Sequence, residues 1–207
     1  MSKSRSRAEQ KESTRRAILD QTLALSGKTP LAAISVRHVA KVVGIAPASF
    51  YRHFDSIDEL GLALVDESFA SLRAVLREVR RGKPTPREIV STSVEALVAH
   101  AGQRRDHFAF IARERFAGPP VVREAVRLQL ALFESELAID LARLAPAWSS
   151  DDVRAVAKLI VATMVETIAD VIVGDLPADT EVRAQAETLI KMVLVGAIHW
   201  RSDHEAG

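Results

Sequence analysis

The stretch SVRHVAKVVGIAPASFYRHF, residues 35–54, decides how this chain folds and how its other segments are interpreted. Ser35 has the side chain of a helix N-cap, and apolar residues recur after it at helical spacing, which predicts a short amphipathic helix. Gly44 follows the last of them and can adopt the left-handed conformation that ends a helix without steric cost. Pro47 suits the first turn of a second helix, where its missing N–H would have been unpaired. The stretch therefore predicts two short helices joined by a turn.

The second helix is expected to run to about Phe54, with polar side chains on its outer face. Phe50 and Phe54 are one helical turn apart, so both can face inward. Small residues on the other face allow close approach to a DNA major groove, and Tyr or Arg can reach phosphates or base edges. Two short helices joined by a glycine-containing turn have the geometry of a helix-turn-helix. The residues expected to bind DNA are Arg15, Ser35, Arg37, Ala48, Ser49, Tyr51, Arg52 and His53.

The charge of the chain is divided at the end of this stretch. Residues 1–54 carry ten Lys or Arg and three acidic residues, whereas residues 55–207 carry eighteen and twenty-four, within a net charge of only +1. A basic excess confined to one end is typical of a surface that binds phosphates, whereas charge that serves solubility alone is not segregated in this way. The division favours DNA binding over the alternative of a helical hairpin without DNA contact.

Length and composition indicate a folded protein without cysteine chemistry. With 207 residues, 48% of them hydrophobic, the chain can bury a substantial core and lies between one and two typical domains in length. No apolar run approaches the ~18 residues that a membrane span needs. The charged N-terminal residues also lack the apolar segment of a signal peptide. We therefore expect a cytoplasmic protein that has no membrane partner and, without cysteine, no disulfide or thiolate metal site.

Motifs of enzyme and metal chemistry are absent from the sequence. It has no glycine-rich phosphate loop, no HExxH or GxSxG motif and no cysteine nucleophile. The six histidines are scattered, and His100 and His107 would lie two turns apart only if one helix continued through Gly102. The sequence therefore predicts no catalytic residue, no metal and no cofactor.

The segments next to the helix-turn-helix complete an N-terminal unit and connect it to the rest. Residues 1–7 form a basic arm that is expected to be disordered in isolation and that can enter a minor groove or contact phosphates. A first helix is expected over about residues 8–25. A long helix is expected over about residues 56–79, where Ser56 and Glu59 have the spacing of a capping box.

Prolines and glycines divide the remaining chain into further helices. The clearest break is RRGKPTP at residues 80–86, and Thr85 with Glu88 predicts a second capping box. GPP at residues 118–120 is expected to end one helix and start the next, and Ser149 to cap another. The expected helices cover about residues 88–101, 108–115, 120–144, 150–172 and 179–200.

A set of small, apolar and aromatic residues recurs from the helix-turn-helix into the helix after it: Ser35, Val39, Ala40, Gly44, Tyr51, Phe54, Leu60 and Leu64. This pattern resembles the TetR family of bacterial one-component regulators over about residues 8–66. GIAPASFYRHF, ARERF at residues 112–116 and the pair His199 and Trp200 are also similar to one subgroup. Members of this subgroup repress unsaturated fatty acid synthesis or fatty acid desaturation and sense acyl-CoA.

The resemblance implies an all-α homodimeric repressor of about nine helices. A three-helix helix-turn-helix domain, residues 1–55, would bind double-stranded operator DNA, and residues 56–207 would bind a small effector and form the dimer. The implied effector is long-chain acyl-CoA, whose phosphates suit arginine forks and whose chain suits an apolar tunnel. The implied effector-binding residues are Phe108, Ile111, Arg113, Arg115 and Phe116. The implied dimer residues are Leu159, Thr163, Ile168, Leu189, Met192, Val193, Gly196 and Trp200.

Several alternatives stay open. The last two helices can complete the core of a monomer, and residues 113–115 can be a solvated helix end. A repressor of an efflux or catabolic operon that responds to a xenobiotic would need a promiscuous aromatic cavity, and only 5% of the residues are aromatic. An acyl-CoA-binding protein or enzyme with an incidental helix-turn-helix would act on acyl-CoA without DNA.

Overall fold

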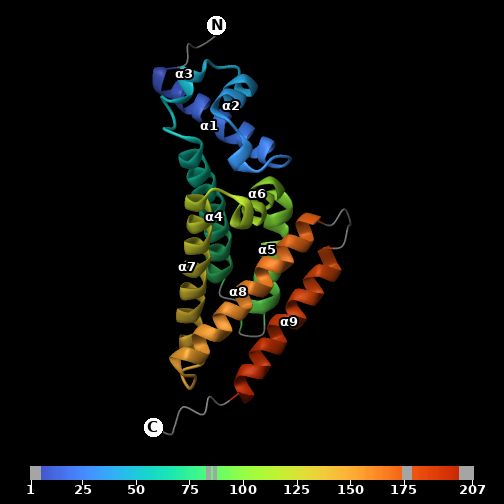
Figure 1. Ribbon diagram of the computed structural model, residues 1–207. Coiled ribbons are helices and arrows are strands. Elements are labelled where there is room, and N and C mark those ends of the chain that lie inside the picture. Colours follow the sequence, from blue (N-terminus) through green and yellow to red (C-terminus); the bar gives the residue numbers. More distant parts are fainter. Residues whose placement is uncertain (1–5, 83–84, 86–87, 174–178, 201–207) are drawn as a thin grey trace. The chain divides into compact units, whose positions relative to one another are not determined.

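The computed structural model describes residues 6–82, 85, 88–173 and 179–200. All regular structure in these residues is helical, which confirms the predicted all-α class (Figure 1). None of the helices described is long and apolar enough to cross a membrane. The elements are α1 (Arg7–Ser26), the 3₁₀ turn η1 (Leu31–Ala33), α2 (Val36–Val43), α3 (Pro47–Phe50), α4 (Ile57–Arg81), α5 (Ile89–Gln103), α6 (Arg105–Ala117), α7 (Pro120–Leu144), α8 (Ser150–Val173) and α9 (Asp179–His199).

Short-range hydrogen bonds define the starts of α1 and α2. The Ser6 hydroxyl accepts from the N–H of Glu9 at 3.2 Å, and the Glu9 carboxylate accepts from the N–H of Ser6 at 2.8 Å. This capping box was not predicted, and it includes the end of the predicted arm in the start of α1. The other arm residues, 1–5, lie outside the described part of the chain. Ser35 caps α2 as predicted, because its hydroxyl accepts from the N–H of His38 at 3.2 Å.

The turn after α2 has the left-handed residue that the sequence predicts. Gly44 has a φ of 78°, and its N–H donates to the carbonyl groups of Ala40 and Lys41. The N–H of Ile45 donates to Ala40 as well, at 2.9 Å. These bonds satisfy the last carbonyl groups of α2 in the Schellman arrangement. A side chain would be strained at this φ, so glycine is needed here.

The helix α3 is shorter than predicted, ending at Phe50 instead of near Phe54. Residues 51–53 form a tight turn, in which the N–H groups of His53 and Phe54 both donate to the carbonyl of Phe50, at 2.8 and 3.1 Å. A carbonyl shared in this way interrupts the regular helical ladder. The inward direction of both phenylalanines is confirmed, since they are 0% and 1% exposed and their ring centroids are 6.0 Å apart.

The chain divides into two compact units, of which the first comprises residues 1–70 and 106–126. Gly61 on α4 allows a close approach within this unit, because a Cβ there would lie 2.4 Å from Leu31 Cδ2 and 2.9 Å from Val122 Cγ2. The fully buried side chains of the unit include Ile18, Leu31, Val39, Phe50, Phe54, Leu60, Leu64, Val65, Phe110 and Glu114.

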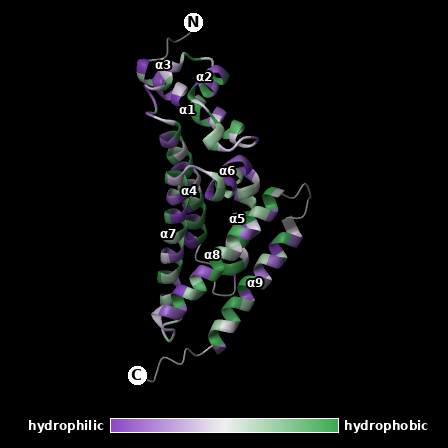
Figure 2. Cartoon of the chain, viewed as in Figure 1, coloured by the Kyte–Doolittle hydropathy of each residue, from purple (hydrophilic) through white to green (hydrophobic). Residues whose placement is uncertain are grey.

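The second unit comprises residues 71–105 and 127–207. Within it, α5, α8 and α9 pack against one another. Figure 2 shows hydrophobic residues along much of the length of α8 and α9. The core of the unit contains Val94, Val98, Leu141, Val153, Val156, Ala157, Ile160, Ala186 and Ile190.

The compact units do not coincide with the predicted domains, because the first unit extends beyond residue 55 and includes α6. The predicted boundary separates functions rather than packing units, and it remains a prediction.

The predicted helix boundaries in the rest of the chain are close, but both capping boxes differ in detail. At α4, the Ser56 hydroxyl accepts from the N–H of Glu59 at 3.0 Å, whereas the Glu59 carboxylate accepts from the N–H of Asp55. Before α5, the Glu88 carboxylate accepts from both the N–H and the hydroxyl of Thr85, at 3.0 and 2.7 Å. A carboxylate is a stronger acceptor than a hydroxyl. Glu59 and Glu88 therefore accept from the donors nearest to them, and the two mutual bonds of a capping box do not both form.

The predicted break at residues 118–120 and the predicted cap of α8 are both confirmed. The helix α7 begins at Pro120, in the position where a missing N–H costs least. The Ser149 hydroxyl accepts from the N–H of Asp152 at 3.1 Å, directly before α8.

Candidate nucleic-acid interface

The turn of α3 presents the predicted DNA-binding residues in two groups. Ala48, Tyr51 and Arg52 are exposed, and Ser49 is half-buried beside them. Tyr51 is 56% exposed, although its ring lies edge-on to that of Phe50, with centroids 5.7 Å apart. This contact orients the phenol on the surface while its hydroxyl stays accessible. The group is suited to phosphates and base edges, since it combines a small side chain, a phenol and a guanidinium.

Three other predicted DNA-binding residues differ in how accessible their side chains are to DNA: Ser35, Arg37 and Arg15. Ser35 already caps α2, and Arg37 is exposed on the first turn of that helix. The guanidinium of Arg15 lies over the ring of Phe54, 4.7 Å from its centroid, and the residue is half-buried. A cation in this position stabilises the packing of α1 and still exposes part of its charge.

His53 differs from the predicted outward-facing basic group, because it is half-buried and holds little charge at neutral pH. Burial lowers its pKa first, and the positive charges of Lys11, Arg15 and Arg52 lower it further. Its Nδ1 atom is buried without a hydrogen-bond partner among the described residues. We therefore do not assign His53 a cationic phosphate contact.

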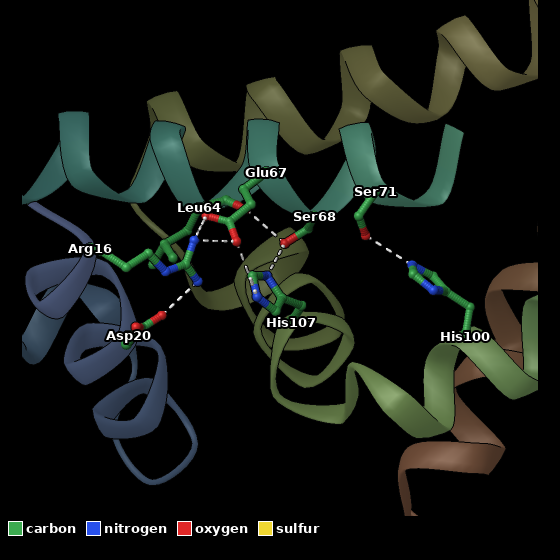
Figure 3. Close-up of polar contacts among 8 residues, drawn as sticks. All are labelled: Arg16, Asp20, Leu64, Glu67, Ser68, Ser71, His100 and His107. Atoms are coloured by element: carbon green, nitrogen blue, oxygen red, sulfur yellow. Dashed lines mark hydrogen bonds and ion pairs between the residues drawn. The ribbon is translucent and has the colours of Figure 1, made fainter. Parts of the chain in front are cut away.

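Arg16 is the basic neighbour of Arg15 on α1, but its guanidinium is bound by two acidic side chains. Its Nη1 lies 2.7 Å from Glu67 Oε1 and its Nη2 lies 2.6 Å from Asp20 Oδ1 (Figure 3). The bonds to Asp20 and then Glu67 raise the pKa of Arg16 above its usual value. These contacts join α1 to α4, so Arg16 contributes to packing rather than to a phosphate-binding surface.

Glu67 also lies next to a buried serine–histidine pair. The Ser68 Oγ lies 2.7 Å from the carbonyl oxygen of Leu64 and forms a hydrogen bond of 2.9 Å with Nδ1 of His107 (Figure 3). His107 Nε2 lies 3.7 Å from Glu67 Oε1. Ser68 is only 5% exposed, so the pair lacks the accessibility that a nucleophile activated by histidine needs to reach a substrate.

Sequence reasoning missed this network, although one part had a local signal. Arg16 and Asp20 are four residues apart on a helix, which is the spacing of an ion pair. The partners Glu67 and His107 are far away in the sequence, and only folding places them beside α1. Among the described residues, no group of three or more His, Cys, Asp or Glu side chains is arranged to hold a metal ion.

The residues predicted to bind an effector lie on α6 and have different surroundings. Phe108 is buried and Ile111 half-buried, whereas Phe116 is 72% exposed and carries the guanidinium of Arg115 over its ring, 4.4 Å from the centroid. Arg113 Nη2 donates to the carbonyl of Gly27 at 2.9 Å. The residues therefore do not all face one cavity in this structure, and their role stays a prediction.

Glu114, in the middle of the same segment, is a buried acid that holds the loop before the helix-turn-helix. The residue is 0% exposed, and its Oε1 accepts from the N–H of Leu31 at 3.1 Å. Together with the bond from Arg113 to Gly27, it fixes both ends of the loop between α1 and η1. Gly118 gives it room, since a Cβ there would lie 2.9 Å from Glu114 Oε2.

Replacing Glu114 by glutamine is expected to change the pH dependence of stability. Burial raises the pKa of Glu114 above its ordinary value of 4.5, while the N–H of Leu31 and the charge of Arg113 oppose this effect. The folded chain therefore keeps this proton to higher pH than the unfolded chain, and the stability it contributes is lost as the pH rises through the folded pKa. Between the unfolded and the folded pKa of Glu114, the free energy of unfolding of Glu114→Gln should therefore rise relative to that of the native protein by about 1.4 kcal/mol for each pH unit.

Urea unfolding of both proteins between pH 4 and pH 8 measures this difference, roughly spanning the range in which carboxyl groups titrate in proteins. The amide oxygen of glutamine can still accept from Leu31, so the fold is retained. A difference that does not change with pH would contradict the raised pKa.

The predicted dimer residues fall into an exposed and a packed group. Val193 packs against the core of the second unit, and Thr163 and Ile168 are half-buried. The exposed group contains Leu159, Leu189, Met192, Gly196 and Trp200. The helices α8 and α9 thus complete the monomer core with one side and leave apolar residues exposed on the other.

The N-terminal segment and the fold of this chain are both similar to those of known proteins. Residues 18–64 match the family model described as bacterial regulatory proteins, tetR family. A TetR-like transcriptional regulator from Rhodococcus sp. RHA1 has a similar structure, with a TM-score of 0.73 and 18% identity over 93% of this chain and 100% of that chain.

Two fatty acid regulators are also similar in structure. FadR from Bacillus subtilis, solved in complex with stearoyl-CoA, has a TM-score of 0.71 and 16% identity over 87% of this chain and 98% of that chain. The fatty acid degradation regulator FadR from Bacillus halodurans has a TM-score of 0.70 and 15% identity over 96% of this chain and 100% of that chain. At these identities the likeness shows a common fold. By this fold and by the match of its N-terminal segment, the chain is similar to the TetR family of bacterial regulatory proteins.

Proposed function

We propose that this protein is a transcriptional repressor that binds DNA as a homodimer and responds to a small apolar effector. The observation that carries the proposal is the helix-turn-helix of α2 and α3, with Tyr51 and Arg52 exposed on a basic end of the chain. The match of residues 18–64 to the TetR family model supports it. Both members of the serine–histidine pair are buried away from substrate, which favours regulation over hydrolysis.

A homodimer determines the kind of DNA site. Two copies related by a two-fold axis place their α3 segments in successive major grooves, about 34 Å apart. The operator is therefore a near-palindrome with one helical turn between its half-site centres. The exposed apolar residues of α8 and α9 supply a surface for the dimer, because contiguous exposed apolar residues favour association.

Long-chain acyl-CoA is the proposed effector, and genes of fatty acid unsaturation are the proposed targets. The likeness of residues 112–116 to the acyl-CoA-sensing subgroup and the fold shared with a stearoyl-CoA-bound regulator support this assignment. The segment also contains Glu114, whose bond to Leu31 reaches the loop before the helix-turn-helix. An effector that binds differently when this loop is held or released shifts the affinity for DNA.

Titration of selected DNA with acyl-CoA tests the proposal. Double-stranded DNA enriched from a random library by the full-length protein should contain a near-palindrome. Stearoyl-CoA and oleoyl-CoA should change its dissociation constant by roughly 5- to 150-fold, the usual range of allosteric coupling. Coenzyme A without an acyl chain is the control. Enrichment without any acyl-CoA effect would remove the effector, and failure to enrich any sequence, or acyl-CoA turnover without DNA, would remove the repressor.

A further inference from the structure

The exposed side of α8 carries charges in a symmetric order. Five residues follow one another at intervals of four: Arg154, Lys158, Ala162, Glu166 and Asp170. All five are exposed, whereas the opposite side of the helix belongs to the core of the second unit. The order is two basic residues, one small residue and two acidic residues. Inverting the direction of the helix about Ala162 therefore places each charge opposite one of the other sign.

We propose that this side of α8 packs antiparallel against the same side of α8 in a second copy of the chain, with the two-fold axis at Ala162. The inference rests on the proposed homodimer and assigns its register. A two-fold axis brings residue pairs together reciprocally, so Lys158 lies opposite Glu166 of the second copy and Arg154 opposite Asp170. Each pair occurs twice. Rows of residues spaced by four form the ridges that interdigitate when two helices cross.

The alternative registers keep fewer attractive pairs. Sliding one helix by one turn sets Lys158 or Glu166 against Ala162 and leaves one of the two kinds of attractive pair. Sliding it by two turns sets Lys158 or Glu166 against the same residue of the second copy. Like charges placed opposite each other across an interface are destabilising. Ala162 is the member of the row whose self-contact is uncharged and small. The row thus favours the register at Ala162, which forms both kinds of attractive pair, over registers that form only one of them or bring like charges together.

A groove between α8 and α9 provides the place where the inner charge pair meets. It has a volume of about 320 Å³ and is lined by Glu166 and Asp170 of α8, with Gln185 of α9 opposite. Leu159 and Leu189 supply an apolar part of the same groove. A lysine side chain fits this combination, because its methylene stem packs on apolar surface while its ammonium group reaches a carboxylate. In the proposed register, the groove of each copy receives Lys158 of the other.

The surroundings of the row permit a close approach of a second copy. A Cβ added at Gly196 on α9 meets no heavy atom within 4 Å, so the second copy finds open space there. Leu189, Met192 and Trp200 are 44%, 65% and 69% exposed, and their burial supplies apolar contact area. Arg154 also contacts Asp151 in its own chain, so its pair with Asp170 of the second copy competes with that contact.

Charge reversal at the inner pair tests the register in the full-length protein. Lys158→Glu places two acidic pairs in its homodimer, and Glu166→Lys places two basic pairs there. Each variant should dimerise at least about tenfold more weakly than the native chain, since two attractive pairs become repulsive. An equimolar mixture should restore dimerisation as a heterodimer, because each copy then faces the opposite charge at both positions. The double variant K158E/E166K should dimerise like the native chain.

Sedimentation equilibrium and native mass spectrometry distinguish these species. Arg143→Glu, an exposed reversal at the end of α7, is the control and should not change dimerisation. A native chain that stays monomeric at every concentration would remove the homodimer of the proposed function. A native dimer whose two single variants dimerise normally, or do not prefer each other in the mixture, would remove only the register at Ala162.

Discussion

Replacing Phe50 by alanine is expected to lower the free energy of unfolding by about 3–5 kcal/mol, the usual loss for a buried phenylalanine. The ring is 0% exposed and lies 6.0 Å from that of Phe54, centroid to centroid. Alanine leaves a cavity beneath the turn that carries the DNA-binding side chains. Urea unfolding followed by far-ultraviolet circular dichroism measures the change.

The neighbouring variant Tyr51→Ala is the matched control for this loss of stability. Tyr51 is 56% exposed, so its removal should change the free energy of unfolding by less than about 1 kcal/mol. Equal losses for the two variants would contradict the orientation of this turn, because they would place both rings in the core.

The same Tyr51→Ala variant is expected to have the largest effect on DNA binding, weakening it roughly tenfold to a hundredfold in a dimer that loses two phosphate contacts. The exposed phenol has its hydroxyl available, and the ring contact with Phe50 holds it in place. A phosphate contact carries no sequence information, so selected and unrelated DNA should both bind more weakly. Fluorescence anisotropy with the two DNAs measures the ratio. A loss confined to the selected DNA would show that Tyr51 reads bases.

Arg52→Ala separates the effect of charge from that of the phenol. Each lost cationic phosphate contact lowers the slope of log K against log salt by about 0.9 in magnitude, so a dimer that loses two should show a change of nearly two. Tyr51→Ala should leave this slope unchanged, because the phenol is neutral. A slope that Arg52→Ala does not alter would place this guanidinium away from the phosphates.

The helix-turn-helix could be predicted because its signals are local. Ser35 caps α2 through a bond three residues along the chain, and Gly44 ends that helix through its own φ of 78°. The inward packing of Phe50 and Phe54 follows from their spacing. The length of α3 was overestimated, because its last residues form a turn that periodicity does not distinguish from a helix.

Local sequence signals could not predict which charged side chains are exposed and which are bound within the protein. Arg15 and Arg16 are neighbours in a basic segment, yet one lies over Phe54 and the other is held by Asp20 and Glu67. The effector segment shows the same limit: a bond across 83 residues connects Glu114 to Leu31, and nothing in either local sequence indicates it. Such contacts depend on which helices the fold brings together.

The sequence by itself therefore determined the helical class, most helix ends and the helix-turn-helix, because caps, glycine turns and apolar spacing act within a few residues. The tertiary structure alone decided which polar side chains are used internally and which are exposed. It buries Glu114, pairs the charge of Arg16 with those of Asp20 and Glu67, and leaves the row from Arg154 to Asp170 on the surface of α8. The physical reason is that the free energy of a charge depends on its solvation and on its partners, and both are set by segments far away in the chain.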